Sequence, residues 1–411
     1  MANSITLWRN RNFVKLWIGQ TVSQLGSRIT REGLPFTALK VLNAGPAQMG
    51  MLNGLSGVVV LLFGLSAGVW GDRLRRRPIL IAADLGRAAL LSLVPLAAFW
   101  HVLRMWHLYA IGALAGVLTL FFNVAYQSYL PSLVNGEQLV EGNAKLMLSS
   151  TVAEIAGPSL TGLLVQLITA PIAILFDALS FVFSAVMVWS IRAQEVKVEP
   201  TRHAEGVWAE TTAGLEFIAG NPILRPLACR EMMAYFFFGF LGPLYVLYAI
   251  DYLKLTPFQL GLTIAVGGVG GTVGSMLSAR VVRWLGLGRT FLFTGLIHGL
   301  CAMLIPAAHA PASFAIPMLM AGQLFGDSAF AVYAINELSV RQQAAPADVL
   351  GRVNGAMQLA TWGILPIGAF VGGYLAQAFG VRLVLTIAAA GVILSSGWLF
   401  TQPLLALRRD A

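Results

Sequence analysis

Apolar residues in this chain come in continuous runs of about 18 to 25 residues, not in the i, i+3, i+4 stripe of a helix on a soluble protein. A helix that is apolar on all sides is buried in protein or lipid, and about 20 residues cross the hydrocarbon core of a bilayer. Polar, Gly and Pro breaks separate twelve such segments. The predicted spans are residues 13–41, 48–70, 79–100, 106–129, 145–168, 171–191, 226–250, 257–280, 290–308, 314–339, 353–376 and 383–405. The pattern therefore predicts an all-α membrane protein with 12 transmembrane helices.

The composition supports lipid as the solvent. Hydrophobic residues make up 57% of the 411 residues and charged residues 11%, whereas soluble domains have roughly 45–50% and about 25%. So few charges cannot cover the surface of a soluble protein. Cys229 and Cys301 form no C-x-x-C or Cys/His cluster, so we expect neither a disulfide scaffold nor a metal site.

The one sizeable polar stretch lies between the sixth and seventh spans and contains the sequence "EVKVEPTRHAEG". We interpret residues 193–221 as a cytoplasmic linker that carries a short amphipathic helix over 207–218. The predicted domains are an N-terminal six-helix bundle over 1–192, this linker, and a C-terminal six-helix bundle over 222–411.

The distribution of the basic residues predicts the orientation, because Lys and Arg accumulate in cytoplasmic loops. A cytoplasmic amino terminus places 20 of the 27 Lys and Arg residues on the inner side, and leaves outside only Lys40, Arg104, Lys254 and Arg382. The formal charge of +9 is then a topology signal and does not indicate nucleic acid as a partner. We expect a multi-pass protein of the cell (inner or plasma) membrane with both termini in the cytoplasm.

The two halves of the chain are related by a fixed offset of 211 residues. This offset aligns six pairs of identical residues: Gln48 with Gln259, Gly50 with Gly261, Gly57 with Gly268, Asn143 with Asn354, Gly157 with Gly368, and Gly162 with Gly373. Because the offset covers an even number of spans, both halves have the same orientation. Parallel repeats of this kind predict two six-helix bundles around a central cavity.

The loop after the second span reads "GVWGDRLRRRPILI", from Gly68 to Ile81. Small residues such as Gly68 allow close helix approach, and the arginines hold the loop in the cytoplasm. A plain basic anchor loop would have the same composition, but the order of the residues resembles the G-x-x-x-D-R-x-x-R-[RK] loop signature of the major facilitator superfamily. The resemblance implies that Asp72 helps to set the inward and outward states, supported by the cluster Arg73, Arg76 and Arg77.

Two further segments are similar to one branch of that superfamily, the bacterial exporters that include the enterobactin exporter and macrolide-efflux proteins. They are "QSYLPSLVNGEQLVEGNAKL" from Gln127 and "RQQAAPADVLGRVNGAM" from Arg341, in corresponding loops. A third segment, "AGPSLTGLL" from Ala156, is similar to the fifth-span motif of proton-driven exporters, but Ala153 and Thr161 replace two of its glycines. The resemblance implies export of drugs or siderophores.

Motifs that would indicate an enzyme are either incomplete or lie where the required local structure cannot form. The sequence "GLSAG" fits G-x-S-x-G but lies inside a predicted transmembrane helix, where no strand-to-helix elbow forms. "GGVGGTVG" has Val273 at the last glycine position of the dinucleotide fingerprint, and Gly270 and Gly274 are better explained by close helix packing. The chain has no G-x-x-x-x-G-K-[ST] loop. We therefore expect no enzyme activity and no cofactor, and favour a secondary carrier.

Ionisable residues within spans are costly and indicate function by default. They are Arg28, Arg31, Glu32, Asp84, Arg87, Glu154, Asp177, Asp327 and Glu337. Arg28 and Glu32 are spaced to pair on one helix face, and Asp84 and Arg87 can form a structural ion pair. The resemblance implies that spans one, four, seven and ten line the cavity.

On that basis Glu32 or Asp327 is the hypothetical proton carrier, with Arg31 as an electrostatic switch or anion contact. Arg28 and Glu154 are further candidates for coupling or substrate binding. Polar groups among the aromatics of spans four and seven add Asn123, Tyr126 and Tyr235 as candidates that line the cavity.

The favoured function is a secondary exporter of amphipathic small molecules, a proton-coupled antiporter that works as a monomer by alternating access. The alternative is an uptake carrier for a nutrient or metabolite with the same fold. A membrane-embedded enzyme or receptor has least support, because the chain has no nucleophile-base motif and no soluble sensory domain. The identity of the substrate is not encoded in any motif.

Overall fold

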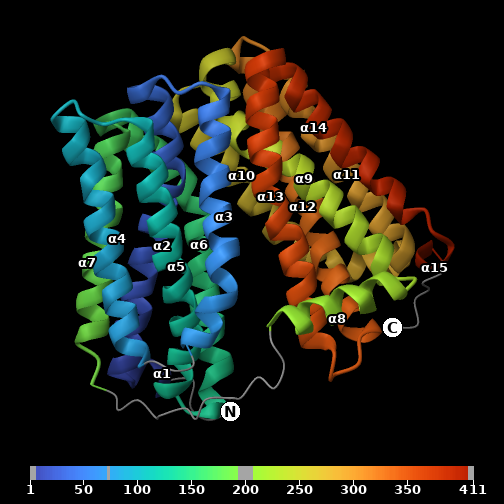
Figure 1. Cartoon of the computed structure of the whole chain (residues 1–411), viewed down its shortest axis with the longest axis horizontal. Helices are drawn as coiled ribbons and strands as arrows, with labels where there is room; N and C mark the ends of the chain where they lie inside the picture. The colour runs from blue at the N-terminus through green and yellow to red at the C-terminus, as the bar shows by residue number, and fades with distance from the viewer. Residues whose placement is uncertain (1–5, 72–74, 193–206, 406–411) are drawn as a thin grey trace. The chain divides into compact units, whose positions relative to one another are not determined.

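The computed structural model describes residues 6–71, 75–192 and 207–405, and all of its regular elements in these ranges are helices (Figure 1). In the first half they are α1 (Thr6–Arg9), α2 (Arg11–Leu42), α3 (Pro46–Gly71), α4 (Arg76–Phe99), α5 (Met105–Tyr129), η1 (Leu130–Ser132), α6 (Gly136–Ile168) and α7 (Ala170–Trp189). The second half has α8 (Val207–Gly220), α9 (Leu224–Leu247), η2 (Tyr248–Tyr252), α10 (Pro257–Leu285), α11 (Leu287–Ala307), α12 (Ala312–Ala344), α13 (Leu350–Phe379), α14 (Val381–Ser395), η3 (Ser396–Leu399) and α15 (Gln402–Leu405).

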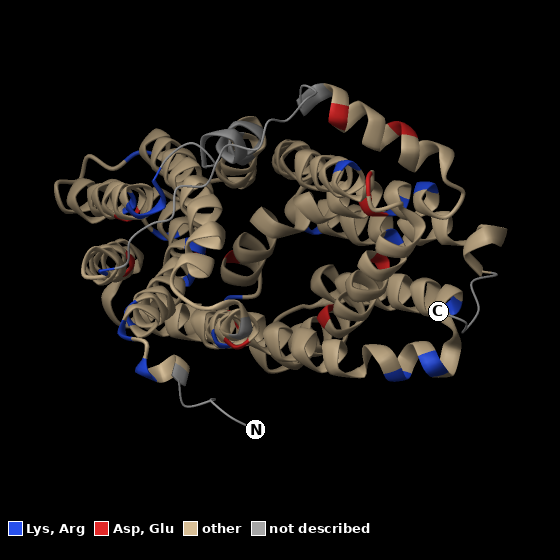
Figure 2. Ribbon diagram, turned by 90° about the horizontal axis from the view of Figure 1, so that it is seen from below, with Lys and Arg blue, Asp and Glu red and all other residues tan. Residues whose placement is uncertain are grey.

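Eleven helices within the described residues are long and apolar enough to cross a membrane. They include every long helix except α2, whose 32 residues contain Arg28, Arg31 and Glu32 and are correspondingly less apolar. The chain is therefore a multi-pass membrane protein. The membrane crossing of α2, and with it the count of twelve, stays a prediction. Charged residues are sparse along the helices of both units (Figure 2).

The helices form two compact units. Unit 1 comprises Met1–Ala44 and Val58–Arg202, and unit 2 comprises Gly45–Gly57 and His203–Ala411. The first turns of α3 thus belong with unit 2, where a Cβ at Gly50 would lie 2.8 Å from the Cα of Gly373. The predicted domain limits of 1–192, 193–221 and 222–411, and the cavity between the bundles, stay predictions.

Several helix contacts recur in the two units. In unit 1, α2 packs on α6 and α7, and α4 packs on α5 and α7. In unit 2, α9 packs on α13 and α14, and α11 packs on α12 and α14. These pairs correspond helix by helix in the two halves. The offset of 211 residues read from the sequence therefore relates the packing of the units as well as their residues.

Glycines at the repeated contacts allow close approach of the same two helices in each unit. Gly157 of α6 lies against the Arg28 side chain of α2, and Gly368 of α13 lies against Gly239 of α9. Both pairs are related by the offset of 211 residues. Gly270 of α10 contacts the backbone of α12, which confirms its predicted role in close helix packing.

The predicted linker helix is present as α8, which packs on α13 and α9 of unit 2. A Cβ at Gly214 would overlap the backbone carbonyl of Arg352, so α8 lies directly on the first turn of α13. Buried Ile218 joins a small apolar cluster with Val353 and Met357. The remaining linker residues, 193–206, lie outside the described ranges.

Candidate functional site

The predicted charges of α2 lie beside a carboxylate from α6. Arg28 Nη2 lies 3.2 Å from Glu154 Oε1, and their side chains are 22% and 55% exposed. Arg28 therefore pairs with Glu154 of the facing helix, where the sequence spacing had suggested Glu32. Glu32 is half-buried and interacts electrostatically with Arg31 and Arg28. Four of the five candidate coupling residues are thus brought together within unit 1.

Asp327, the fifth candidate, lies in unit 2 at the contact between α12 and α10. A Cβ at Gly267 would touch the Asp327 carboxylate and would lie 3.2 Å from Oε1 of Gln323. Asp327 also interacts electrostatically with Cys301 of α11. Its carboxylate is half-buried among α10, α11 and α12.

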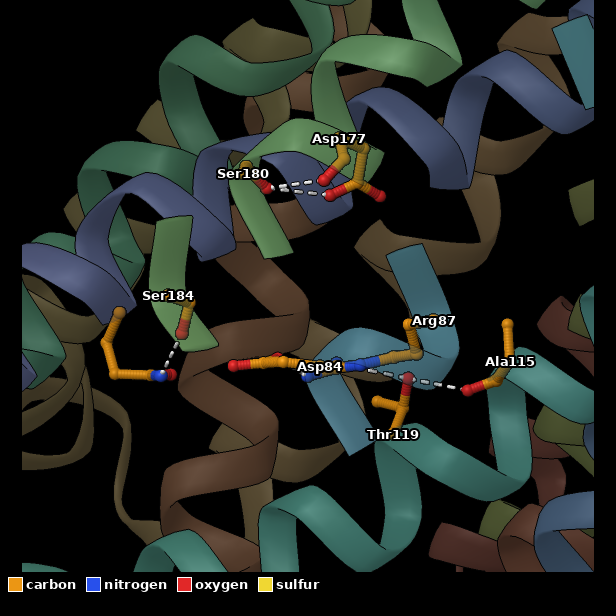
Figure 3. A network of polar contacts seen from close by, with 8 residues as sticks. Asp84, Arg87, Ala115, Thr119, Asp177, Ser180 and Ser184 are labelled. Carbon is orange, nitrogen blue, oxygen red and sulfur yellow. Dashed lines mark hydrogen bonds and ion pairs between the residues drawn. The ribbon is translucent and has the colours of Figure 1, made fainter. Parts of the chain in front are cut away.

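A buried arginine on α4 belongs to a network of polar contacts inside unit 1 (Figure 3). Arg87, 4% exposed, forms the predicted ion pair with Asp84, which is 0% exposed. Its Nη1 donates to the Thr119 hydroxyl of α5 at 3.4 Å. The guanidinium Cζ lies 4.5 Å from the centroid of the Phe122 ring and 4.0 Å from that of Phe181. Stacking of a guanidinium on aromatic faces stabilises a cation away from water.

A second carboxylate reaches the same arginine from α7. Asp177 is 1% exposed and interacts electrostatically with both Arg87 and Asp84. The Ser180 hydroxyl lies 3.0 Å from Asp177 Oδ1 and 2.8 Å from the Asp177 backbone oxygen (Figure 3). A Cβ at Gly26 of α2 would overlap Ser180 Oγ, so only glycine leaves room for these polar groups.

Amide and hydroxyl groups continue this network toward α2. Gln20 Nε2 donates to the Ser184 hydroxyl at 3.3 Å. Ser184 in turn interacts with the Asp84 carboxylate. Ser180 and Ser184 are one helical turn apart on α7; both contact α2, and Ser184 also contacts α4. The network therefore links α2, α4, α5 and α7 inside one unit.

Unit 2 buries a different charge cluster. Arg230 of α9 is 1% exposed, and its Cζ lies 3.9 Å from the centroid of the Tyr333 ring of α12. Arg341 Nη2 lies 3.3 Å from Glu337 Oε2. Glu231 interacts electrostatically with Glu337, Arg230 and Arg341. This cluster contains two carboxylates and two guanidiniums.

The residues of the loop signature are only partly described. Gly68 lies in the last turns of α3, whereas Asp72 and Arg73 lie outside the described residues. Arg76 begins α4, and Arg77 donates through Nε to the Val188 carbonyl at 3.2 Å and through Nη2 to the next carbonyl. Arg77 therefore caps the C-terminal end of α7, where a cation also complements the helix dipole.

The three aromatic and amide candidates have different surroundings. Asn123 on α5 is exposed. Tyr126 stacks on Phe122 with ring centroids 5.9 Å apart, and its hydroxyl is buried. Tyr235 on α9 is half-buried and interacts with the Glu231 and Arg230 charges. Tyr126 and Tyr235 are thus each placed beside a buried arginine cluster of their own unit. Among the described residues, no group of His, Cys, Asp and Glu is arranged to hold a metal ion.

Comparison with known proteins identifies the family. Residues 16–369 match the model of the Major Facilitator Superfamily. The chain belongs to the Major Facilitator Superfamily. It is therefore a transporter of small molecules, and not an enzyme.

Relatives of this transporter match it over most of their length. It is 25% identical over 375 residues to macrolide efflux protein A of Streptococcus pyogenes, covering 90% of each chain. It is 26% identical over 368 residues to multidrug efflux pump Tap of Mycolicibacterium fortuitum, covering 87% of each chain. Both relatives are efflux proteins by name.

Solved structures support the same fold. A bacterial homologue of the iron transporter ferroportin, in an inward-facing state, aligns with a TM-score of 0.74 at 19% identity and covers 95% of this chain and 98% of its own. The nucleoside transporter NupG aligns with a TM-score of 0.78 at 11% identity and covers 94% of this chain and 98% of its own. At these identities the likeness shows the fold alone.

Sequence reasoning did not combine Asp177 with Asp84 and Arg87, because these residues lie on different helices. A usable signal was nevertheless present. Asp177, Ser180, Phe181 and Ser184 recur at i, i+3, i+4 and i+7 in an otherwise apolar span, which is one helix face. A face with this polar content in a membrane span needs partners on a neighbouring helix.

Proposed function

We propose that this transporter is a secondary exporter of amphipathic small molecules of the drug or siderophore class. The observation that carries the proposal is the relation to macrolide efflux protein A over 90% of both chains. A second efflux protein, the Tap multidrug pump, matches over 87% of both chains. Relatedness over the full length favours a shared transport direction more than a local motif does. The uptake alternative has no comparable support.

Proton antiport by alternating access is the coupling mechanism we propose, with Glu32 or Asp327 as the proton carrier. Glu32 is supported by its position beside Arg31 and Arg28 on α2. A substrate that binds at the ion pair of Arg28 with Glu154 can displace one partner from the other. Arg31 then acts as the switch, since loss of a neighbouring positive charge favours protonation of a carboxylate.

We propose that the loop signature controls the exchange between states. Asp72 and Arg73 supply its charges, and Arg76 and Arg77 anchor the start of α4. Support comes from the hydrogen bonds of Arg77 to the last carbonyls of α7, which tie the first turn of α4 to the end of α7. A change in the loop is thereby transmitted to α7, the helix that carries Asp177.

We also propose a location in the cell (inner or plasma) membrane with both termini in the cytoplasm, and function as a monomer. The excess of Lys and Arg in alternate loops supports the orientation. Asn123, Tyr126 and Tyr235 are the proposed contacts with an amphipathic substrate. Aromatic rings with polar tips suit a site that is mainly apolar with a few hydrogen-bonding groups.

The test is transport of radiolabelled erythromycin and of ethidium in everted membrane vesicles with an imposed pH gradient. Export predicts uptake into the everted vesicles that stops when the gradient is dissipated. Glu32→Gln and Asp327→Asn are compared with Asp348→Asn, which removes an exposed carboxylate before α13. Wild-type rates in both of the first two variants would show that neither residue carries the proton. Accumulation of the labelled compounds by intact expressing cells would favour the uptake alternative.

A further inference from the structure

The buried polar contact between α4 and α7 in unit 1 holds more negative than positive groups. Asp84, Arg87 and Asp177 are 0%, 4% and 1% exposed, so two carboxylates face one guanidinium away from solvent. Asp84 forms the direct ion pair with Arg87. Asp177 Oδ2 is buried, and the hydrogen-bonding side chains that meet the Asp177 carboxylate are the hydroxyls of Ser180 and Thr30.

The groups around Asp177 do not balance the excess negative charge of the two carboxylates. From α4 it meets Arg87 and Asp84, and from α2 it meets the Thr30 hydroxyl and the space at Gly26. On α7 its neighbour is the Ser180 hydroxyl. Arg28, Arg31 and Glu32 of α2 interact with one another and with Glu154 of α6. Arg87 in turn meets α5 through the Thr119 hydroxyl and the Phe122 ring, and the Tyr126 ring stacks on Phe122.

The two other charged clusters described above, one in each unit, contain equal numbers of the two signs. The cluster of α2 and α6 has two arginines and two glutamates: Arg28, Arg31, Glu32 and Glu154. The buried cluster of unit 2 also has two of each: Arg230, Arg341, Glu231 and Glu337. An ionised carboxylate without its own cation is costly in a dry interior, and such a group is neutralised by a proton instead.

The repeat shows that this contact does not need charges to pack. At the offset of 211 residues, Asp177 corresponds to Ala388, and Gly26 and Ser180 correspond to Phe237 and Gly391. In unit 2 the Phe237 ring lies directly against Gly391. The glycine is therefore on α2 in unit 1 and on α14 in unit 2, and an aromatic ring takes the place of the polar groups.

The arginine contact differs between the units in the same way. Arg87 corresponds to His298 and Asp84 to Gly295, whereas the stacked rings Phe122 and Tyr333 correspond to each other. The corresponding helices thus pack in unit 2 without counterparts of Asp84 or Asp177. Because apolar packing is available at this position, the excess carboxylate in unit 1 requires a reason other than folding.

We propose that Asp177 is a proton-binding site inside unit 1, occupied while Asp84 is paired with Arg87 and emptied when the contact of α2 and α7 at Gly26 opens. The proton bonds to Asp177 Oδ2 from water, and its return to water restores the carboxylate, with no other bond made or broken. This site is distinct from Glu32 and Asp327.

The position of the site connects it to transport, and this step rests on the proposed function. Gly26 lies two residues before Arg28 on α2, so a movement of α2 that follows substrate binding at the Arg28 and Glu154 pair also moves the wall of the Asp177 site. Opening this wall admits water to Asp177. The site therefore supplies a proton that is released by the movement itself.

Infrared difference spectroscopy of the purified full-length transporter in lipid nanodiscs tests the site without any substrate. The probe is a pH step, and the signal is the carbonyl stretch of a protonated carboxylic acid. We expect a component of this band in the wild type that shifts when aspartate is labelled with ¹³C in its side-chain carboxyl, that is absent in Asp177→Asn, and that is kept in Glu32→Gln and Asp327→Asn, the other proposed proton carriers. Asp348→Asn is the matched control and should keep the band.

The balance of two carboxylates against one guanidinium gives a second, independent test. Asp84→Asn leaves one carboxylate for one guanidinium, so Asp177 should become the ionised partner of Arg87 and the band should again be lost. Persistence of the whole band, with no component lost, in either Asp177→Asn or Asp84→Asn would overturn the proposal. Should the variants fail to fold, a wild-type band that does not shift on aspartate labelling overturns it as well.

Transport of erythromycin distinguishes the two proposals. Absence of erythromycin and ethidium export in the wild type, with an infrared band that depends on Asp177, refutes the proposed function and leaves the proton site standing. Proton-driven export in the wild type with no such band refutes the Asp177 site and leaves the exporter standing.

Discussion

Arg28 of α2 forms an ion pair with Glu154 of α6, with 3.2 Å between Nη2 and Oε1. The pair joins the two helices at the place where Gly157 lets them approach closely. In unit 2 the corresponding residues are Gly239 and Leu365, and the Leu365 carbonyl lies against Gly239. The corresponding helices of unit 2 therefore make the same close contact without an ion pair.

Removal of this ion pair should affect transport more than stability. The Glu154 side chain is 55% exposed, and pairs of this exposure contribute about 1 kcal/mol or less. We expect Glu154→Gln to leave the thermal unfolding midpoint in detergent nearly unchanged and to lower the rate of erythromycin export. The charge reversal Arg28→Glu with Glu154→Arg should restore part of the rate. A large fall in the unfolding midpoint of Glu154→Gln would contradict this assignment.

Gly26 of unit 1 and Gly391 of unit 2 lie on opposite sides of corresponding helix contacts, and this can be tested by building the contact of unit 2 into unit 1. Gly26→Phe alone places a ring against Ser180 and Asp177, and overpacking of this kind costs about 1–3 kcal/mol. The triple variant with Ser180→Gly and Asp177→Ala rebuilds the apolar contact of unit 2, so it should unfold at a higher temperature than Gly26→Phe. A triple variant less stable than the single variant would show that the two contacts are not equivalent.

Arg87 should be needed for folding only while its carboxylates are present. Arg87→Met leaves Asp84 and Asp177 buried without a cation, which costs about 3–5 kcal/mol for a broken buried pair. The variant with Arg87→Met, Asp84→Leu and Asp177→Ala removes the charges together and should recover most of that loss. Thermal unfolding in detergent measures both. Equal losses in the two variants would indicate that the stacking on Phe122 and Phe181, and not the charge, is what the bundle requires.

Close helix packing in unit 2 should distinguish two glycines of α13. A Cβ at Gly368 would overlap the Phe236 carbonyl of α9, whereas a Cβ at Gly355 would meet nothing within 4 Å. Gly368→Ala should therefore lower the unfolding midpoint. Gly355→Ala is the matched control and should raise stability by up to about 1 kcal/mol, because alanine favours the helix. The same midpoint in both variants would contradict the close approach of α13 and α9.

The unequal loops of the two repeats predict unequal effects on transport. Asp72 corresponds to Arg283 at the offset of 211 residues, and Arg283 lies exposed in the last turn of α10. If the loop signature controls the exchange between states, Asp72→Asn should lower the rate of erythromycin export in vesicles much more than Arg283→Ala. Protein amounts in the membrane must be matched by immunoblot. Equal losses of transport in the two variants would show that the N-terminal loop has no special role.

The sequence by itself determined the helical membrane fold, the repeat and the family. Long apolar runs can be satisfied only by helices in lipid, and the offset of 211 residues predicted which helices of one unit correspond to those of the other. The order of the residues around Asp72 indicated the superfamily that the match over residues 16–369 shows. The local ion pair of Asp84 with Arg87 was also predictable, because both residues lie on one helix.

The tertiary structure decided which charges meet across helices. Helical spacing suggested Glu32 as the partner of Arg28, but Glu154 of α6 takes that place because Gly157 brings the two helices together. Asp177 joins Arg87 because α7 packs on α4, and Gly26 of α2 leaves room for the Asp177 carboxylate. Spacing along one helix fixes the face on which a side chain lies, whereas its partner depends on the packing distance and rotation of a second helix. For that reason the balance of charge at a buried contact appears only once the helices are packed.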